Sequence, residues 1–144
     1  MEVFLPDFLN TLFGWILSLL GRSKIKAEHQ THYEELRYKT AEALTMYANC
    51  LSNPINIEVS CLPDSYKEGS NELRRIASGF DALSKVLPKN AKGIPVNKEQ
   101  LKDVSRYLIG LSNSFSYVPI ESHTRRKEVR EWEQEVRTIL DIQD

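Results

Sequence analysis

A chain of 144 residues is long enough for one domain, and a hydrophobic content of 41% allows it to bury a core. Charged residues make up 27% of the sequence, which excludes a wholly disordered chain, and a net charge of -1 argues against a protein built mainly to bind nucleic acid. Two cysteines, Cys50 and Cys61, are expected to be free thiols, although they could pair in an oxidising compartment.

The most hydrophobic part of the chain is residues 3–20, VFLPDFLNTLFGWILSLL. As a helix, this segment would rise about 27 Å, close to the thickness of the hydrocarbon core of a bilayer. It lacks the positive n-region and the small-residue cleavage site of a signal peptide. The sequence therefore predicts a membrane anchor over residues 1–22, with these apolar side chains facing lipid: Phe8, Leu9, Leu12, Phe13, Trp15, Ile16, Leu19 and Leu20.

Small and polar residues lie on one arc of the same segment. Three of them are spaced four apart, which lets two helices approach closely and predicts self-association: Asn10, Gly14 and Ser18. Only acidic residues precede the segment, whereas three cations follow it: Arg22, Lys24 and Lys26. The positive-inside tendency then predicts a single-pass inner-membrane protein with its N-terminus outside and residues 23–144 in the cytoplasm. A helix lying in the plane of the membrane interface and an ordinary core helix of a soluble bundle remain open as alternatives.

Residues 24–51 are predicted to form the first helix of the following domain. Its apolar stripe recurs every three or four residues: Tyr33, Leu36, Thr40, Ala43, Leu44, Tyr47 and Leu51. Asn53-Pro54 ends it, because proline disfavours helical geometry in the residue before it. Residues 55–62 are expected to be a loop.

The second helix is predicted over residues 64–87, after Pro63, where Ser65 and Glu68 have the spacing of a capping box. One long packing seam runs along it: Tyr66, Leu73, Ile76, Ala77, Phe80, Leu83 and Leu87. Its connection to the next helix is rich in Gly, Pro and Asn, as a loop should be.

Two further amphipathic helices complete the domain. The third, residues 97–117, begins at Asn97 with Gln100 in the capping-box position, and its stripe is Leu101, Val104, Leu108, Leu111 and Phe115. The fourth, residues 122–142, has an inward face of Val129, Trp132, Val136, Ile139 and Leu140. Four such helices joined by short loops predict an all-α protein, an antiparallel four-helix bundle.

Two polar clusters bear on possible chemistry. His29 and His32, with Glu28 and Glu35, lie within two helical turns and have spacings that can surround a metal, but a solvated polar face is the expected role. The densest positive cluster is a possible contact patch for phosphates of nucleic acid or lipid: Arg125, Arg126, Lys127 and Arg130. Interspersed glutamates favour an ordinary charged helix face there. No Gly-rich phosphate loop or GxSxG motif is present, so neither a metal, a cofactor nor an enzyme is predicted.

Residues 46–83 contain YANCLSNP followed by LPDSYKEGSNELRRIASGFDAL. This pattern resembles uncharacterised small bacterial inner-membrane proteins with one N-terminal membrane helix and a helical cytoplasmic domain. The matching residues are Tyr47, Ala48, Asn49, Asn53, Pro54, Tyr66, Leu73, Arg74, Ala77 and Ser78. The resemblance implies a membrane-anchored helical protein and carries no activity with it.

The leading functional hypothesis is a membrane-anchored scaffold or interaction protein without catalysis of its own. Its partners would be the bilayer and a second protein or copies of itself, with neither nucleic acid nor a small-molecule substrate expected. The alternative is a soluble all-helical binding or regulatory domain whose N-terminal helix packs in the core or in a partner's groove. A membrane-proximal enzyme or metal site at His29 and His32, and a small toxin or immunity-type membrane protein, are further hypotheses.

Overall fold

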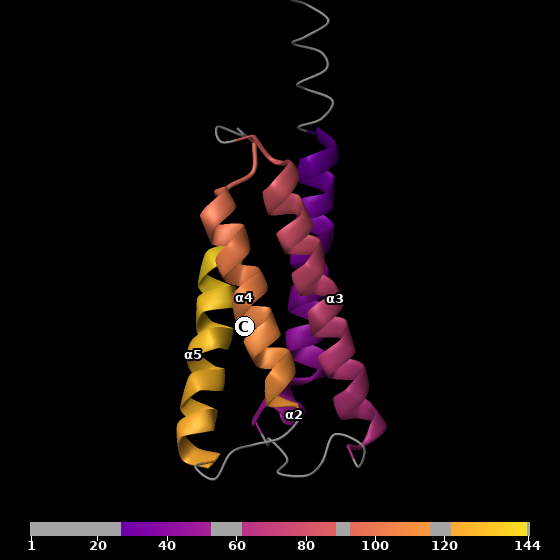
Figure 1. Ribbon diagram of the computed structural model, residues 1–144, viewed down its shortest axis with the longest axis vertical. Helices are drawn as coiled ribbons and strands as arrows, with labels where there is room; N and C mark the ends of the chain where they lie inside the picture. The colour runs from indigo at the N-terminus through magenta and orange to yellow at the C-terminus, as the bar shows by residue number, and fades with distance from the viewer. Residues whose placement is uncertain (1–26, 53–61, 89–92, 116–121, 144) are drawn as a thin grey trace, which may run out of the picture.

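The computed structural model of the protein describes residues 27–52, 62–88, 93–115 and 122–143, and of residues 122–125 only the backbone. Over these residues the chain is helical and contains no strand, which confirms the all-α prediction. The long helices lie side by side, and each runs opposite to the one before it in sequence (Figure 1). They are the first helix (residues 27–46), α3 (Asp64–Val86), α4 (Lys98–Ser114) and α5 (Ser122–Leu140), with the short α2 (Ala48–Ser52) after the first.

The predicted helix over residues 24–51 is interrupted in the structure. A turn at Tyr47 separates the first helix from α2. The chain keeps nearly the same course, because the Tyr47 N–H donates to the Ala43 carbonyl at 2.9 Å and the Leu51 N–H donates to the Tyr47 carbonyl at 3.0 Å. The predicted apolar stripe therefore stays on one side of both pieces, where Tyr33, Leu44 and Leu51 are buried.

Helix α3 begins without a side-chain cap, so the predicted capping box of Ser65 and Glu68 is wrong. The N-cap position is occupied by Pro63, in an extended conformation, and no side-chain hydrogen bond caps the helix. Ser65 therefore lies inside the first turn, two residues past the N-cap, where its hydroxyl cannot play the capping role.

The start of α4 is the capping box that the sequence predicts. The Gln100 N–H donates to Asn97 Oδ1 at 2.8 Å, and the Asn97 N–H donates to Gln100 Oε1 at 2.9 Å. Two backbone donors that an uncapped helix would leave unpaired are thus satisfied. At the other end, α4 stops at Ser114, three residues before the predicted end.

The apolar stripes of the helices meet in one core. Leu36 of the first helix lies against Gly79 of α3, and the Ser105 hydroxyl of α4 donates to the Ala77 carbonyl of α3 at 2.9 Å. Trp132 of α5 lies against Gly110 of α4. The largest fully buried side chains are Tyr33, Phe80, Phe115, Leu44, Leu51, Leu73, Ile76, Leu83, Leu101, Leu108, Leu111 and Leu140. All of them belong to the predicted stripes.

Arg37 joins the first helix to the end of α5. Its Nε donates to the Leu140 carbonyl at 2.6 Å, and its Nη2 donates to the Asp141 carbonyl at 2.6 Å. The last carbonyls of a helix have no partner within that helix, so this guanidinium acts as their cap. The contact also places the first helix beside the end of α5.

Candidate functional site

The predicted anchor lies outside the described residues. This applies to its lipid-facing side chains, to the self-association residues Asn10, Gly14 and Ser18, and to the flanking cations Arg22, Lys24 and Lys26. Within the part of the chain that the structure describes, no helix combines the length and the apolar character needed to cross a membrane. Cys61 also falls outside that part.

The predicted basic patch is exposed at the start of α5. Arg126, Lys127 and Arg130 are all exposed, and none of them forms an ion pair with another described residue. The side chain of Arg125 lies outside the described residues. Glu133 is held one turn further on by Arg137, at 3.0 Å from Nη2. The three described cations therefore present positive charge to solvent.

The histidines of the first helix gather no set of metal ligands from the described residues. His29 is half-buried, whereas His32, Glu28 and Glu35 are exposed. Among residues 27–52, 62–88, 93–115 and 126–143, no three His, Cys, Asp or Glu side chains come together in a group that could hold a metal ion. The described residues thus give the hypothesis of a metal site at these histidines no support.

Cys50 sits in a small aromatic cluster at the α2 end of the molecule. Its thiol is free and buried, and burial raises its pKa, an effect that hydrogen bonds with Ser65 and Tyr66 reduce. The rings of Tyr47 and Tyr66 meet Phe115 edge-on, with centroids 6.0 Å and 5.9 Å apart. A buried thiol with a raised pKa stays protonated, which makes it a packing group rather than a nucleophile.

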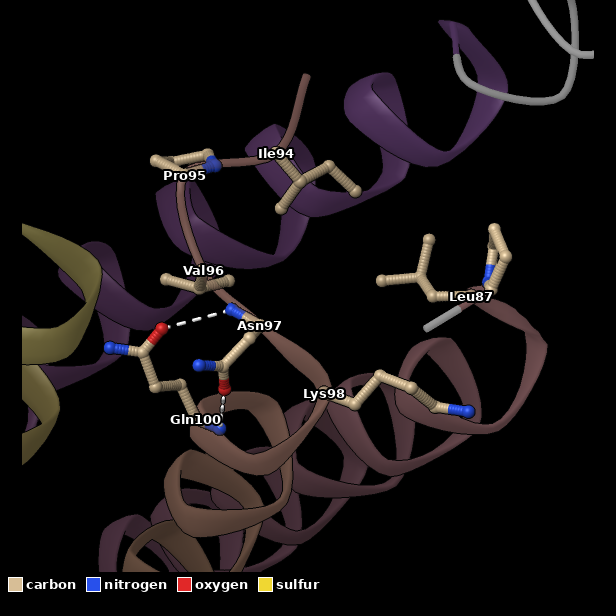
Figure 2. A pocket seen from close by; sticks show the side chains of 8 residues that line it. Leu87, Ile94, Pro95, Val96, Asn97, Lys98 and Gln100 are labelled. Atoms are coloured by element: carbon tan, nitrogen blue, oxygen red, sulfur yellow. Dashed lines mark hydrogen bonds between the residues drawn. The ribbon is translucent and has the colours of Figure 1, made fainter. Parts of the chain in front are cut away.

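Figure 2 shows a pocket of about 260 Å³ where α3 ends and α4 begins. Its lining residues are Leu87, Pro88, Ile94, Pro95, Val96, Asn97, Lys98 and Gln100. The side-chain carbonyls of Asn97 and Gln100 are already committed to the capping box, so the pocket offers apolar walls, the amine of Lys98 and the two amide NH2 groups as donors. This set of side chains provides neither a carboxylate nor an imidazole for acid–base chemistry.

The sequence predicts a plain loop over residues 88–97 and misses the part that two of its residues take in the core. Ile94 and Val96 are buried, and they flank the exposed Pro95. The alternation of apolar side chains on either side of a proline was the available signal.

A second hollow, which we term the Tyr38 groove, lies between the first helix and the end of α5. It encloses about 480 Å³ and is lined by Glu34, Arg37, Tyr38, Ala41, Asp141, Ile142 and Gln143. The ring of Tyr38 is 69% exposed. Two carboxylates, Glu34 and Asp141, border the groove. No local pattern indicates this groove, because its two walls are about a hundred residues apart in the chain.

Arg74 and Arg75, neighbours in α3, make different contacts. Arg75 Nη1 pairs with Glu72 at 2.8 Å on the surface of α3. Arg74 instead crosses to α4, where Nε donates to the Ser112 hydroxyl at 3.3 Å and Nη2 donates to Asn113 Oδ1 at 3.1 Å. Both arginines are therefore structural.

Comparisons with models of protein families, with curated proteins and with solved structures found no match to this chain. The resemblance of residues 46–83 to small inner-membrane proteins stays a prediction.

Proposed function

We propose that this chain is an all-helical binding or regulatory domain without catalysis of its own. In this proposal the domain is an antiparallel four-helix bundle, and its hydrophobic N-terminal segment docks in a groove of a partner protein. One observation carries the proposal: the apolar stripes of the described helices already cover one another, so the core does not require residues 3–20 to complete it.

The chemistry of the described residues supports a role in binding rather than catalysis. The thiol of Cys50 is buried, the histidines of the first helix gather no ligand set, and the polar amides at the pocket of Figure 2 cap a helix. General acid–base or nucleophilic catalysis needs a base within hydrogen-bond reach of the group it activates. No pair of that kind is found among the described side chains discussed above.

The N-terminal segment supplies the driving force for docking. Each large apolar side chain that leaves water contributes about 1.5–3 kcal/mol, and residues 3–20 carry twelve of them besides their small and polar arc. Amphipathic helices of this type bind by laying their apolar face into a hydrophobic groove.

The membrane anchor is the second candidate, because the same segment has the length to cross a bilayer and is followed by Arg22, Lys24 and Lys26. In that case the bundle would hold its partner, or copies of itself, at the membrane surface.

Extraction of cell membranes separates the two candidates. A domain docked on a partner protein is expected in the supernatant after an alkaline carbonate wash, and it should be lost from the partner when residues 1–22 are deleted. Leu12→Arg, on the apolar face of the segment, should abolish binding to the partner protein. Thr11→Arg, on the polar arc, is the control and should leave that binding largely intact. Retention of the intact chain in the pellet until detergent is added would replace our proposal with the membrane anchor.

A further inference from the structure

The exposed face shared by the first helix and α5 carries opposite charges at its two ends. On the first helix, Glu34, Tyr38, Ala41 and Thr45 are spaced four, three and four apart and form one line. Along α5 and the residue that follows it, the matching exposed line is Arg126, Arg130, Gln134, Thr138 and Asp141. The Tyr38 groove joins the two lines near the end of α5.

The acidic end lies around the Tyr38 groove. Glu34 and Asp141 are exposed there, and the cation that lines the groove, Arg37, is already engaged by two carbonyls and by Glu34 at 3.6 Å. The basic end lies at the start of α5, where the exposed Arg126, Lys127 and Arg130 outnumber the exposed Glu131. The face is therefore electrically bipolar along its length.

We propose that this face binds a second copy of the chain in antiparallel orientation. The acidic end of each copy would then meet the basic end of the other, and both contacts would form at once because a two-fold axis repeats them. This inference is independent of what the N-terminal segment binds.

The spacing of the two ends fits a two-fold axis. The Arg37 side chain reaches the Leu140 carbonyl, so these two residues lie within one side chain's length of the same height in the molecule. At 1.5 Å per residue, Arg130 lies about 15 Å from that height in one direction, and Glu34 lies about 4.5 Å in the other. The midpoint falls near Ala41, whose small side chain lets two first helices approach closely, and the exposed ring of Tyr38 then packs on the neighbour beside the axis.

Charge reversal tests the inference on the full chain in mild detergent at low salt. The wild type is expected to be dimeric in sedimentation equilibrium, and Glu34→Lys or Arg130→Glu alone should weaken the dimer roughly tenfold or more, because each puts like charges together twice. When the two variants are mixed, position 34 of either copy again meets an opposite charge at position 130 of the other, so the mixed dimer should form as well as the wild type. Lys102→Glu, on the surface of α4, is the matched control and should leave the dimer intact.

A cross-linking readout keeps the test separate from any association through residues 1–22. In a mixture of isotopically labelled and unlabelled chains, a zero-length carbodiimide should link Lys127 of one copy to Glu34 or Asp141 of the other. The absence of these links in the wild type, or their failure to return when the variants are mixed, would overturn the inference. A monomeric protein that binds polylysine through this face would also overturn the inference. The acidic end would then bind a different, basic partner.

Discussion

At the scale of single residues, three glycines let side chains from other parts of the chain lie directly against a helix backbone. They are Gly69, Gly79 and Gly110. A Cβ on Gly69 would lie 2.7 Å from Phe115 Cε1 and 2.9 Å from Tyr47 Cδ1. On Gly110, a Cβ would lie 3.1 Å from the nearest atom of Trp132. The first distances are shorter than any stable contact, whereas the last requires a shift of only a few tenths of an ångström. Replacing glycine with alanine should therefore cost more stability at Gly69 than at Gly110.

Gly69→Ala is expected to destabilise the protein by about 1–3 kcal/mol, because two aromatic rings must move, one of them the fully buried Phe115. The gain of about 1 kcal/mol in helix propensity offsets only part of this. Gly110→Ala should stay within about 1 kcal/mol of the wild type, since Trp132 is half-buried and can yield. Urea denaturation measures both free energies, and equal losses at the two positions would show that ring packing is not the cause.

Burial of Tyr33 makes stability depend on alkaline pH. The side chain is 1% exposed, and burial raises the pKa of its phenol above the ordinary value, with the Arg37 charge opposing that shift. Because the pKa is raised in the folded state, the neutral phenol contributes its full share to the free energy of unfolding below about pH 10, the ordinary pKa of tyrosine. That contribution is lost as the pH rises through the pKa of the folded state. We expect the free energy of unfolding to fall above about pH 10 less steeply in Tyr33→Phe than in the wild type. Tyr38→Phe, at an exposed ring, is the control, and identical slopes in Tyr33→Phe and wild type would contradict the assignment.

At the scale of elements, two sequences with the same capping spacing behave differently. Asn97 and Gln100 form both hydrogen bonds of the box, whereas Ser65 and Glu68 form neither, because the N-cap there is Pro63. Pro63 follows the buried Leu62 and is extended, so the helix begins only after it. Spacing alone could not reveal this, since it depends on where the preceding residue packs.

Asn97→Ala is expected to lower the free energy of unfolding by about 1 kcal/mol, because it leaves the Gln100 N–H without its acceptor. Glu68→Ala in the corresponding position of α3 should change it by no more than about 0.5 kcal/mol. Paired denaturation curves check the difference. A loss at Glu68 as large as that at Asn97 would mean that α3 is capped in solution by the box that the sequence predicts.

Periodicity predicted the helices and their buried faces well, and it failed where distant segments meet. The stripes of α3, α4 and α5 contain the buried hydrophobic residues of these helices because a period near 3.6 directly encodes one face. The cap that Arg37 provides for α5 joins residues 103 apart, and no local pattern encodes it. The break at Tyr47 was likewise invisible, because the stripe continues across it.

At the scale of the whole molecule, the sequence likewise predicted a surface formed within one helix and missed one assembled from distant segments. The basic end of the bipolar face was predicted, since Arg126, Lys127 and Arg130 are neighbours in the sequence. The acidic end was not, because it combines Glu34 of the first helix with Asp141 after α5. Charge clusters formed within one helix can be found from sequence, whereas those assembled by packing need the fold.

Deletion of residues 1–22 tests how the hydrophobic segment relates to the rest of the molecule. The described helices cover each other's apolar stripes, so the shortened chain should unfold cooperatively at nearly the same urea midpoint as the full chain. The dependence of the free energy on urea should also be unchanged, because its slope follows the surface exposed on unfolding. If the segment instead packs in the core, its removal uncovers apolar surface, and both the midpoint and the slope should fall. That result would contradict docking of the segment on an external partner, because the surface assigned to the partner would be in use within the fold.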